Sequence, residues 1–288
     1  MQIGVVFPQL DMGADREAIR AYAQGVEDLG FEHVLAYDHV LGADPEVHEG
    51  WSGTYSISDT FHEPLVLFGF LAGIVGLELV TGIIILPQRQ TALVAKQAAE
   101  VDILSGGRLR FGVGLGWNAV EYEALGMDFS DRGRRVEEQV DLLRRLWTEP
   151  TLSFSGNDHR ITGAGIAPLP LQCPIPIWIG ATSSARALRR VGRLADGWLA
   201  MGKPGPELAE AADTIRQAAT DAGRDPAQLG IDGRIDVGKG DLQRIAAEAA
   251  GWRDLGATHL SLNTMRAGLK TVDDHLGALS QALGAVRG

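Results

Sequence analysis

The feature that most constrains the fold is a regular alternation of short β-branched runs with longer helical segments along the 288 residues. Short apolar runs rich in Val and Ile predict buried parallel strands, and longer runs with apolar residues three or four positions apart predict helices. The predicted strands cover residues 3–7, 33–37, 78–85, 109–114, 175–180, 197–202, 231–237 and 258–263. The predicted helices cover residues 15–30, 91–107, 134–147, 184–195, 206–223, 241–256 and 272–286, and a further helix begins at Pro64.

Eight such repeats predict an α/β fold, a closed (β/α)8 barrel of the TIM type, because right-handed crossovers make the sheet parallel and eight strands suffice to close it. We expect residues 1–288 to form one barrel domain, since no linker divides the chain. Two insertions interrupt the pattern. A lid loop, Leu41 to His62, follows the second strand, and an irregular Pro/Gly-rich stretch, 149–174, precedes the fifth and is expected to form a hairpin. The active site of such a barrel lies at the carboxyl ends of its strands.

The apolar stretch Leu65–Leu86 has the length of a membrane span. We predict instead a helix followed by a strand, because Glu78 interrupts the stretch and Pro64 and Pro87 bracket it. Its first part is rich in Ala, Leu and Phe, whereas its second part, ELVTGIIIL, is β-branched. The stretch is therefore expected to belong to a soluble core.

Charge and cysteine content narrow the classes of function. A net charge of -11 and a pI near 5.1 disfavour a broad nucleic-acid surface, which needs a face rich in Lys and Arg. Cys173 is the single cysteine, so an internal disulfide and a CxxC metal motif are excluded. The first residues lack the pattern of an export signal, and we expect a cytoplasmic protein. The seven histidines form no metal-binding motif, and no metal is expected.

Asp38 and His39 follow the second predicted strand, in the segment AYDHVLG. Histidine exchanges a proton near neutral pH, and an adjacent carboxylate can orient its ring. A structural histidine with satisfied hydrogen bonds is the alternative interpretation. The place at a strand end makes His39 a candidate catalytic residue, with Asp38 beside it.

Glycines mark the third and fourth strands. Gly82 interrupts the β-branched TGIII, which indicates either a bulge or the close approach of another group. The fourth strand runs into GVGLGW, where Gly114 and Gly116 would leave room for a flat ligand beside Trp117. The G-x-G-x-G spacing and its place after the fourth strand disfavour a dinucleotide-binding fingerprint.

The segment IGATSSARALRR after the fifth strand predicts an anion site. Gly180 permits close approach of the backbone, and Thr182, Ser183 or Ser184 can cap the next helix, whose first amides bind anions. Three arginines of that helix add positive charge: Arg186, Arg189 and Arg190. A capped helix with a solvated basic face is the alternative.

The sequence contains no GxSxG, HExxH or GxxxxGK[ST] motif. Nothing at the strand ends therefore predicts an independent hydrolase. This absence favours a barrel whose chemistry is supplied by a bound organic cofactor.

Four segments, taken in order, carry a family resemblance: DLGFEHVLAYDHV, LVTGIIILPQRQTALVAKQAAEVDILSGGRLRFGVGLGWNAVEYEALGMDFSDRGRRVEEQVDLLRRLW, PIPIWIGATSSARALRRVGRLADGWLA and GATHLSLN. They resemble the bacterial luciferase-like monooxygenase superfamily, and within it the branch of deazaflavin (coenzyme F420)-dependent oxidoreductases. The resemblance runs nearly from end to end. It implies a barrel that binds a flavin or deazaflavin with its ring in the barrel mouth.

The resemblance also implies roles for individual residues. A bulge in the third strand, often with a non-proline cis peptide, would back the ring at Gly82-Ile83. Asp38 and His39 would lie near the reactive carbon, with His39 as the proton carrier. The remaining cofactor-binding positions are the ring segment and the phosphate loop, in which Ala181 replaces a common second glycine: Gly114, Gly116, Trp117, Gly180, Ala181, Thr182 and Ser183.

One departure from the family pattern concerns the substrate. Sugar-phosphate dehydrogenases of the family carry a catalytic glutamate where this sequence has Trp117, which argues against their substrate. Glu121, one helical turn further on, is a candidate replacement. Trp51 and Tyr55 of the lid loop are expected to cover the bound substrate.

The resemblance implies hydride transfer between coenzyme F420 and a small organic substrate. Two alternatives stay open: an FMN-dependent monooxygenase supplied by a separate flavin reductase, and a non-catalytic flavin or deazaflavin carrier. Relatives often form homodimers, and the apolar helices after the second and third strands would supply the interface.

Overall fold

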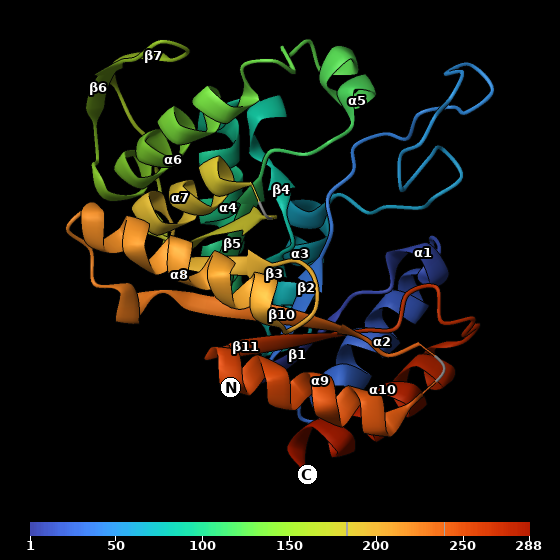
Figure 1. The fold of residues 1–288 in the computed structure, drawn as a ribbon. Coiled ribbons are helices and arrows are strands. Elements are labelled where there is room, and N and C mark those ends of the chain that lie inside the picture. Colours follow the sequence, from blue (N-terminus) through green and yellow to red (C-terminus); the bar gives the residue numbers. More distant parts are fainter. Residues whose placement is uncertain (183, 239) are drawn as a thin grey trace.

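A computed structural model of the protein describes residues 1–182, 184–238 and 240–288. One parallel sheet has the strand order β3-β2-β1-β11-β10-β9-β8-β5-β4, and it closes because β3 (Glu78–Thr81) also pairs with β5 (Leu109–Gly114). β3 and β4 (Ile84–Ile85) share one position in the ring, since both pair with β5. The predicted (β/α)8 barrel is confirmed, and Figure 1 shows the helices around it.

The other barrel strands are β1 (Gln2–Val6), β2 (His33–Ala36), β8 (Ile177–Ala181), β9 (Gly197–Ala200), β10 (Gly230–Asp236) and β11 (His259–Asn263). The main helices are α2 (Arg16–Asp28), α3 (Pro64–Ala72), α4 (Thr91–Ser105), α6 (Arg132–Thr148), α7 (Ala185–Leu194), α8 (Pro206–Asp221), α9 (Leu242–Leu255) and α10 (Val272–Arg287). Four short helices were not predicted, because they have too few residues to show a period: α1 (Gln9–Met12), α5 (Ala119–Ala124), η1 (Leu86–Gln88) and η2 (Pro226–Gln228).

Local signals explain where several helices begin and end. Asp15 caps α2 by accepting hydrogen bonds from two backbone amides, and Glu63 does the same for one amide of α3, which then starts at Pro64. α4 ends at Gly106, whose φ of 71° lies in the left-handed region that favours glycine. Thr271 begins α10 with a capping box.

Two apolar cores stabilise the barrel. The larger core fills the space between the sheet and the surrounding helices. The smaller core lies inside the barrel and consists of Val6, Leu35, Val80, Trp178 and Leu199. Apolar side chains thus fill only the middle of the barrel interior, and polar groups occupy its two ends.

The amino-terminal end of the barrel interior, here called the barrel base, is filled by a polar cluster rather than by aliphatic side chains. Four of its members are buried and the fifth, Glu78, is half-buried: His33, Glu78, Arg110, Asp232 and Ser261. Arg110 Nη1 donates to Asp232 Oδ2 at 2.7 Å, and Arg110 Nη2 lies 3.0 Å from Glu78 Oε2. Arg110 also lies over the Trp178 ring, with its Cζ 4.6 Å from the ring centroid. The base is therefore an ion-pair network, and two of its members, Asp232 and Ser261, also line the cavity at the barrel mouth.

The third strand is interrupted where Gly82 predicts either a bulge or a close approach. The Gly82-Ile83 peptide bond is cis, as the family resemblance implies. Next to the break, a Cβ on Gly112 would lie 1.9 Å from the carbonyl oxygen of Thr81, so that the two strands approach each other closely there.

Both predicted insertions are present. Residues 37–63 connect β2 to α3 without a helix or a strand, and this lid loop lies beside α5 in Figure 1. β6 (Leu152–Ser155) and β7 (Arg160–Ala164) form an antiparallel hairpin before β8, which confirms the predicted hairpin. None of the described helices is both long and apolar enough to cross a membrane, and the stretch Leu65–Leu86 is divided between α3, β3, β4 and the start of η1.

Candidate functional site

A cavity of about 660 Å³ opens at the carboxyl ends of the barrel strands. This volume lies in the range of about 300–1,000 Å³ that is usual for small-molecule sites. Its lining comes from most of the strands, from the start of α6 and from α7: among others Tyr37, Asp38, His39, Ile83, Gly114, Gly116, Gly180, Thr182, Arg132, Arg186 and Arg234. The cavity therefore has the place that barrel enzymes use for their active sites.

One wall of the cavity is built from Ile83 and glycines. A Cβ on Gly114 would meet the Ile83 side chain at 2.7 Å, and a Cβ on Gly180 would meet it at 3.0 Å. The absence of a side chain at Gly114 and Gly180 leaves space for the Ile83 side chain. Ile83 in turn lines the cavity with an apolar surface. Gly116 has a φ of 65° and packs against Ile85. The result is a wall with few protruding side chains, which suits a planar ligand.

Positive charge gathers at the end of the cavity between α6 and α7. Arg132 and Arg186 line this end together with Thr182 and Ser184, and Ser184 precedes the first residue of α7. The first amides of a helix favour an anion. Ser183, which we predict to take part in the phosphate loop, lies outside the described residues.

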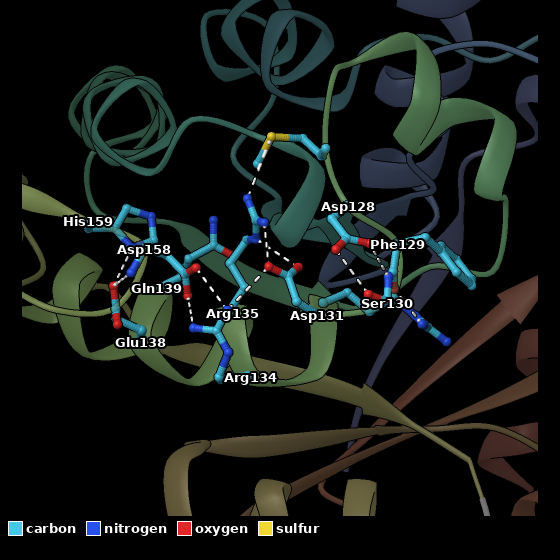
Figure 2. A network of polar contacts seen from close by, with 12 residues as sticks. Asp128, Phe129, Ser130, Asp131, Arg134, Arg135, Glu138, Gln139, Asp158 and His159 are labelled. Carbon is cyan, nitrogen blue, oxygen red and sulfur yellow. Dashed lines mark hydrogen bonds and ion pairs between the residues drawn. The ribbon is translucent and has the colours of Figure 1, made fainter.

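A polar network fixes the segment that carries Arg132. Figure 2 shows Asp128 accepting from both the amide and the hydroxyl of Ser130, at 2.8 and 2.9 Å. One turn into α6, Arg135 donates to Asp131 at 2.6 Å, and Arg134 donates to Asp158 next to β7, also at 2.6 Å. The hairpin is thus tied to the start of α6 through Asp158.

His39 contacts Glu121 rather than its neighbour Asp38. The Nδ1 atom of His39 lies 3.2 Å from Glu121 Oε2, and Glu121 is fully buried. The other carboxylate oxygen accepts the backbone amides of Val40 at 2.7 Å and Leu41 at 3.3 Å. Since Glu121 accepts in each of these contacts, His39 donates from Nδ1, and Nε2 is left for exchange with a ligand.

The carboxylate of Asp38 has partners other than the ring of His39. Its Oδ1 accepts from Arg89 Nη2 at 2.7 Å, and its Oδ2 accepts from the Ile85 amide at 3.0 Å. Arg89 also pairs with Glu63 at the start of α3. Burial raises the pKa of Asp38, and the Arg89 cation opposes that rise. In the structure Asp38 joins β2 to β4 and lines the cavity, and it does not contact His39.

Aromatic rings surround His39 on the side of the lid loop. The ring of His39 lies 4.7 Å from Phe61, 5.1 Å from Tyr55 and 5.6 Å from Trp117, measured between centroids. Tyr55 and Trp117 line the cavity, whereas Trp51 does not and instead packs on Trp117 with 5.7 Å between ring centroids. The lid loop thus covers His39 through Tyr55 and Phe61, and Trp51 only supports this cover.

The lid loop is also held in place by a residue that follows β11, two strands from β2 in the ring. Arg266, which follows β11, donates to Asp59 at 2.9 Å and lies over the Tyr55 ring, with its Cζ 5.0 Å from the centroid. A second cavity of about 100 Å³ adjoins His39 beneath the loop, and its polar lining comes from Tyr55, Ser56, Asp59 and Asn118. His39 therefore borders two separate cavities.

The family model for luciferase-like monooxygenases matches residues 1–259. The chain belongs to the luciferase-like monooxygenase family. Among the described residues, no group of three or more potential metal ligands is found.

Relatives within the luciferase-like family use more than one cofactor, according to their names. The chain is 30% identical over 257 residues, 87% of its own length and 66% of the relative's, to an F420-dependent hydroxymycolic acid dehydrogenase of Mycobacterium tuberculosis. It is 29% identical over 206 residues, 69% of its length and 53% of the relative's, to an FMNH2-dependent dimethylsulfone monooxygenase of Pseudomonas putida. It spans about half the length, 47%, of uncharacterized mycobacterial relatives that it matches at 38% identity.

A solved luciferase-like barrel has the same fold. An F420-dependent secondary alcohol dehydrogenase in complex with an F420-acetone adduct superposes with a TM-score of 0.78 over 100% of this chain and 99% of that one, at 16% identity. At this identity the likeness establishes the fold alone.

Sequence reasoning missed several residues of the site. Arg89, Arg132, Arg234 and Tyr37 all lie at or near the cavity, yet no motif marks them. Arg234 stands at alternating positions with Asp232 and Asp236 in IDGRID, and that charged alternation in a predicted buried strand was the available signal.

Proposed function

We propose that this luciferase-like protein is an oxidoreductase that binds the deazaflavin coenzyme F420 in the 660 Å³ cavity and transfers hydride to or from a small organic substrate. The observation that carries the proposal is the cavity itself. It joins a glycine-rich wall, a cationic end and the His39–Glu121 pair in one space. The name of the relative that aligns over 87% of the chain favours the deazaflavin.

The residues of the cavity fit such a cofactor. Gly82, Ile83, Gly114, Gly116 and Gly180 would hold the ring, because they form the glycine-rich part of the cavity lining. The phosphate would bind at the cationic end, to residues Ala181, Thr182, Ser184, Arg132 and Arg186. When bound, a deazaflavin supplies two-electron hydride chemistry without ready activation of oxygen.

His39 is proposed to exchange the proton that accompanies hydride transfer, and Glu121 to position it. Glu121 fixes Nδ1 of the imidazole as a donor, so Nε2 is the atom that takes up or releases the proton. The 100 Å³ cavity on the lid side of His39 offers a route for proton exchange through its polar lining of Ser56, Asp59 and Asn118. Asp38 is assigned to holding the β4 segment at the cofactor wall.

The second candidate is an FMN-dependent monooxygenase that receives reduced FMN from a separate flavin reductase. The relative named as FMNH2-dependent, at 29% identity over 69% of the chain, favours it. A third candidate, a non-catalytic carrier, would bind the cofactor and show no turnover.

Titration of the purified protein with F420 and with FMN, followed by assays with and without oxygen, separates the three candidates. We expect micromolar or tighter binding of F420 and redox turnover that consumes no oxygen. Binding of FMN alone together with oxygen consumption would establish the second candidate. Tight binding with no turnover over a broad set of alcohols, ketones and enones would establish the carrier.

We further propose that the protein acts as a homodimer through α3 and α4. α3 is apolar on all sides, which is typical of a helix covered on all sides, yet Val66 on α3 is 69% exposed and Leu93 on α4 is 53% exposed. Sedimentation of wild type and Val66→Glu tests this proposal. We expect a dimer for the wild type and a shift to monomer for the variant, and a monomeric wild type would refute it.

A further inference from the structure

Arg234 lies on the wall of the cavity away from the cationic end. It is placed on β10, which lies two strands from β8 in the ring, and its side chain faces the barrel interior. Its Nη1 donates to the hydroxyl of Tyr37 at 2.7 Å. The nearest carboxylate is that of Asp236, 3.7 Å from Nε, and its side chain is 68% exposed to solvent.

The partners of Arg234 differ from those of the other arginines of the barrel interior and its rim. Arg110 meets Asp232 at 2.7 Å and Glu78 at 3.0 Å, and Arg89 meets its two carboxylates at 2.7 and 2.8 Å. Arg234 has a neutral phenol at that distance, because burial raises the pKa of Tyr37 to about 12. Among the described residues, no carboxylate lies within normal hydrogen-bond distance of the Arg234 guanidinium.

The cavity therefore carries cations at two separate places. Arg132 and Arg186 lie at the α6–α7 end, where the proposed function places the cofactor phosphate. Arg234 is not needed for that phosphate, and its charge is available to a second ligand in the same cavity. A guanidinium binds a carboxylate through two parallel hydrogen bonds, which makes it the usual partner of that group.

Aromatic residues connect Arg234 to His39. Tyr55 lines the cavity and lies 5.1 Å from the His39 ring, and the positive charges of Arg266 and Arg234 oppose the rise that burial imposes on its pKa. Tyr55 is thus within electrostatic reach of Arg234 on one side and in ring contact with His39 on the other. A ligand anchored at Arg234 would place its apolar part against Tyr55 and Trp117.

We propose that Arg234 and Tyr37 form a carboxylate-binding subsite, and that the substrate is an aromatic or other apolar carboxylic acid whose reacting group lies near His39. This inference rests on the proposed function, because it assigns the cationic end of the cavity to the cofactor. Arg266 does not share the role, since it already pairs with Asp59 at 2.9 Å.

Benzoate and benzamide are suitable probes, because they have nearly the same shape and differ in charge. Their binding would be measured by tryptophan fluorescence, since Trp117 lines the cavity. The protein would be used both alone and loaded with F420 or FMN. We expect the wild type to bind benzoate at least about tenfold more tightly than benzamide, as a charge-assisted bidentate contact predicts.

The variant Arg234→Met should lose this preference and keep its affinity for benzamide and for the cofactor. The variant Arg234→Gln should also lose the preference for benzoate. Its side chain retains a hydrogen-bond donor toward Tyr37, so this variant provides a second test if Arg234→Met does not fold. The matched control, Arg266→Met, should keep the preference.

Equal binding of the two probes to the wild type would overturn the proposal, and so would an unchanged preference in both Arg234 variants. Weakened cofactor binding by the Arg234 variants would also overturn it, because Arg234 would then belong to the cofactor site. Failure of the proposed function is a distinct result. The protein would then bind neither cofactor, while the effect of Arg234 on benzoate binding could still be measured.

Discussion

The base and the mouth of the barrel both contain buried or half-buried charges, but Arg110 at the base and Arg234 at the mouth are paired differently. At the base, Arg110 has two carboxylate partners at hydrogen-bond distance, Asp232 and Glu78. At the mouth, Arg234 has a phenol, and His39 has one carboxylate on Nδ1. A charged group that forms ion pairs with other protein groups contributes to the structure. A charged group or an imidazole nitrogen that has no such partner can bind a ligand.

The geometry of the fold accounts for this difference. The amino-terminal ends of barrel strands serve stability, and the carboxyl ends carry the loops in which chemistry develops. Substitutions at the base should therefore change the free energy of unfolding, and substitutions at the mouth should change turnover or ligand binding.

The largest effect is expected for Arg110→Met at the base. This substitution leaves the buried Asp232 without its cation and removes a partner of the half-buried Glu78, so the free energy of unfolding should fall by about 3–5 kcal/mol. Urea denaturation measures it. The mouth variant Arg234→Met should lose less than about 1 kcal/mol. Equal losses in the two variants would remove the distinction between base and mouth.

The largest effect at the mouth is expected for His39→Ala. Loss of a positioned proton carrier should lower kcat by about 10²–10⁴, with the unfolding free energy and the affinity for the cofactor unchanged. The value of kcat is measured by steady-state kinetics with the cofactor that the titration identifies. His48→Ala is the control, because His48 lies in the same lid loop, packs beside Trp51 and does not line the cavity. Full turnover by His39→Ala would remove His39 from the mechanism.

Glu121→Gln should have a smaller effect, and it tests the positioning role directly. The Val40 amide holds the remaining side-chain oxygen, so the new amide group would face Nδ1 of His39 and force that nitrogen to accept. We expect kcat to fall by about 10–100-fold, the range seen when a group that orients a functional histidine is removed.

Nitrogen NMR of the histidine ring distinguishes this role from a purely structural one. In wild type the proton of neutral His39 should reside on Nδ1, and in Glu121→Gln it should move to Nε2. A loss of turnover without this tautomer change would contradict the positioning role.

The most gradual effect, and the smallest for a single pH unit, concerns the pH dependence of stability at the base. Burial, assisted by Arg110, lowers the pKa of His259 from 6.5 to about 3. As pH falls below 6.5, the unfolded chain binds a proton that the folded protein does not, so the contribution of His259 is present above 6.5 and is lost toward pH 3. Because the His259 side chain is only partly buried, solvent screening reduces the effect. Relative to His259→Gln, the wild type should therefore lose less than about 1.4 kcal/mol for each pH unit in this window. Parallel stability curves for the two proteins would contradict the assignment.

Much of the architecture could be predicted from the sequence, because strand and helix periods and their caps are local properties. The eight strand positions, the hairpin before β8, and the break at Gly82-Ile83 implied by the family resemblance all follow the expected order. The short helix α5 was not predicted, because its six residues are too few to show a helical period. That helix carries Glu121, the partner of His39.

Sequence alone determined that this chain closes into a barrel and which residues stand at its strand ends, because alternation and chain order suffice for both. Only the tertiary structure decided which of those residues meet. His39 pairs with Glu121, 82 positions away, rather than with adjacent Asp38, and Arg234 meets Tyr37 across 197 positions. Such pairs depend on the register and closure of the whole sheet, and no short segment of the chain contains that information.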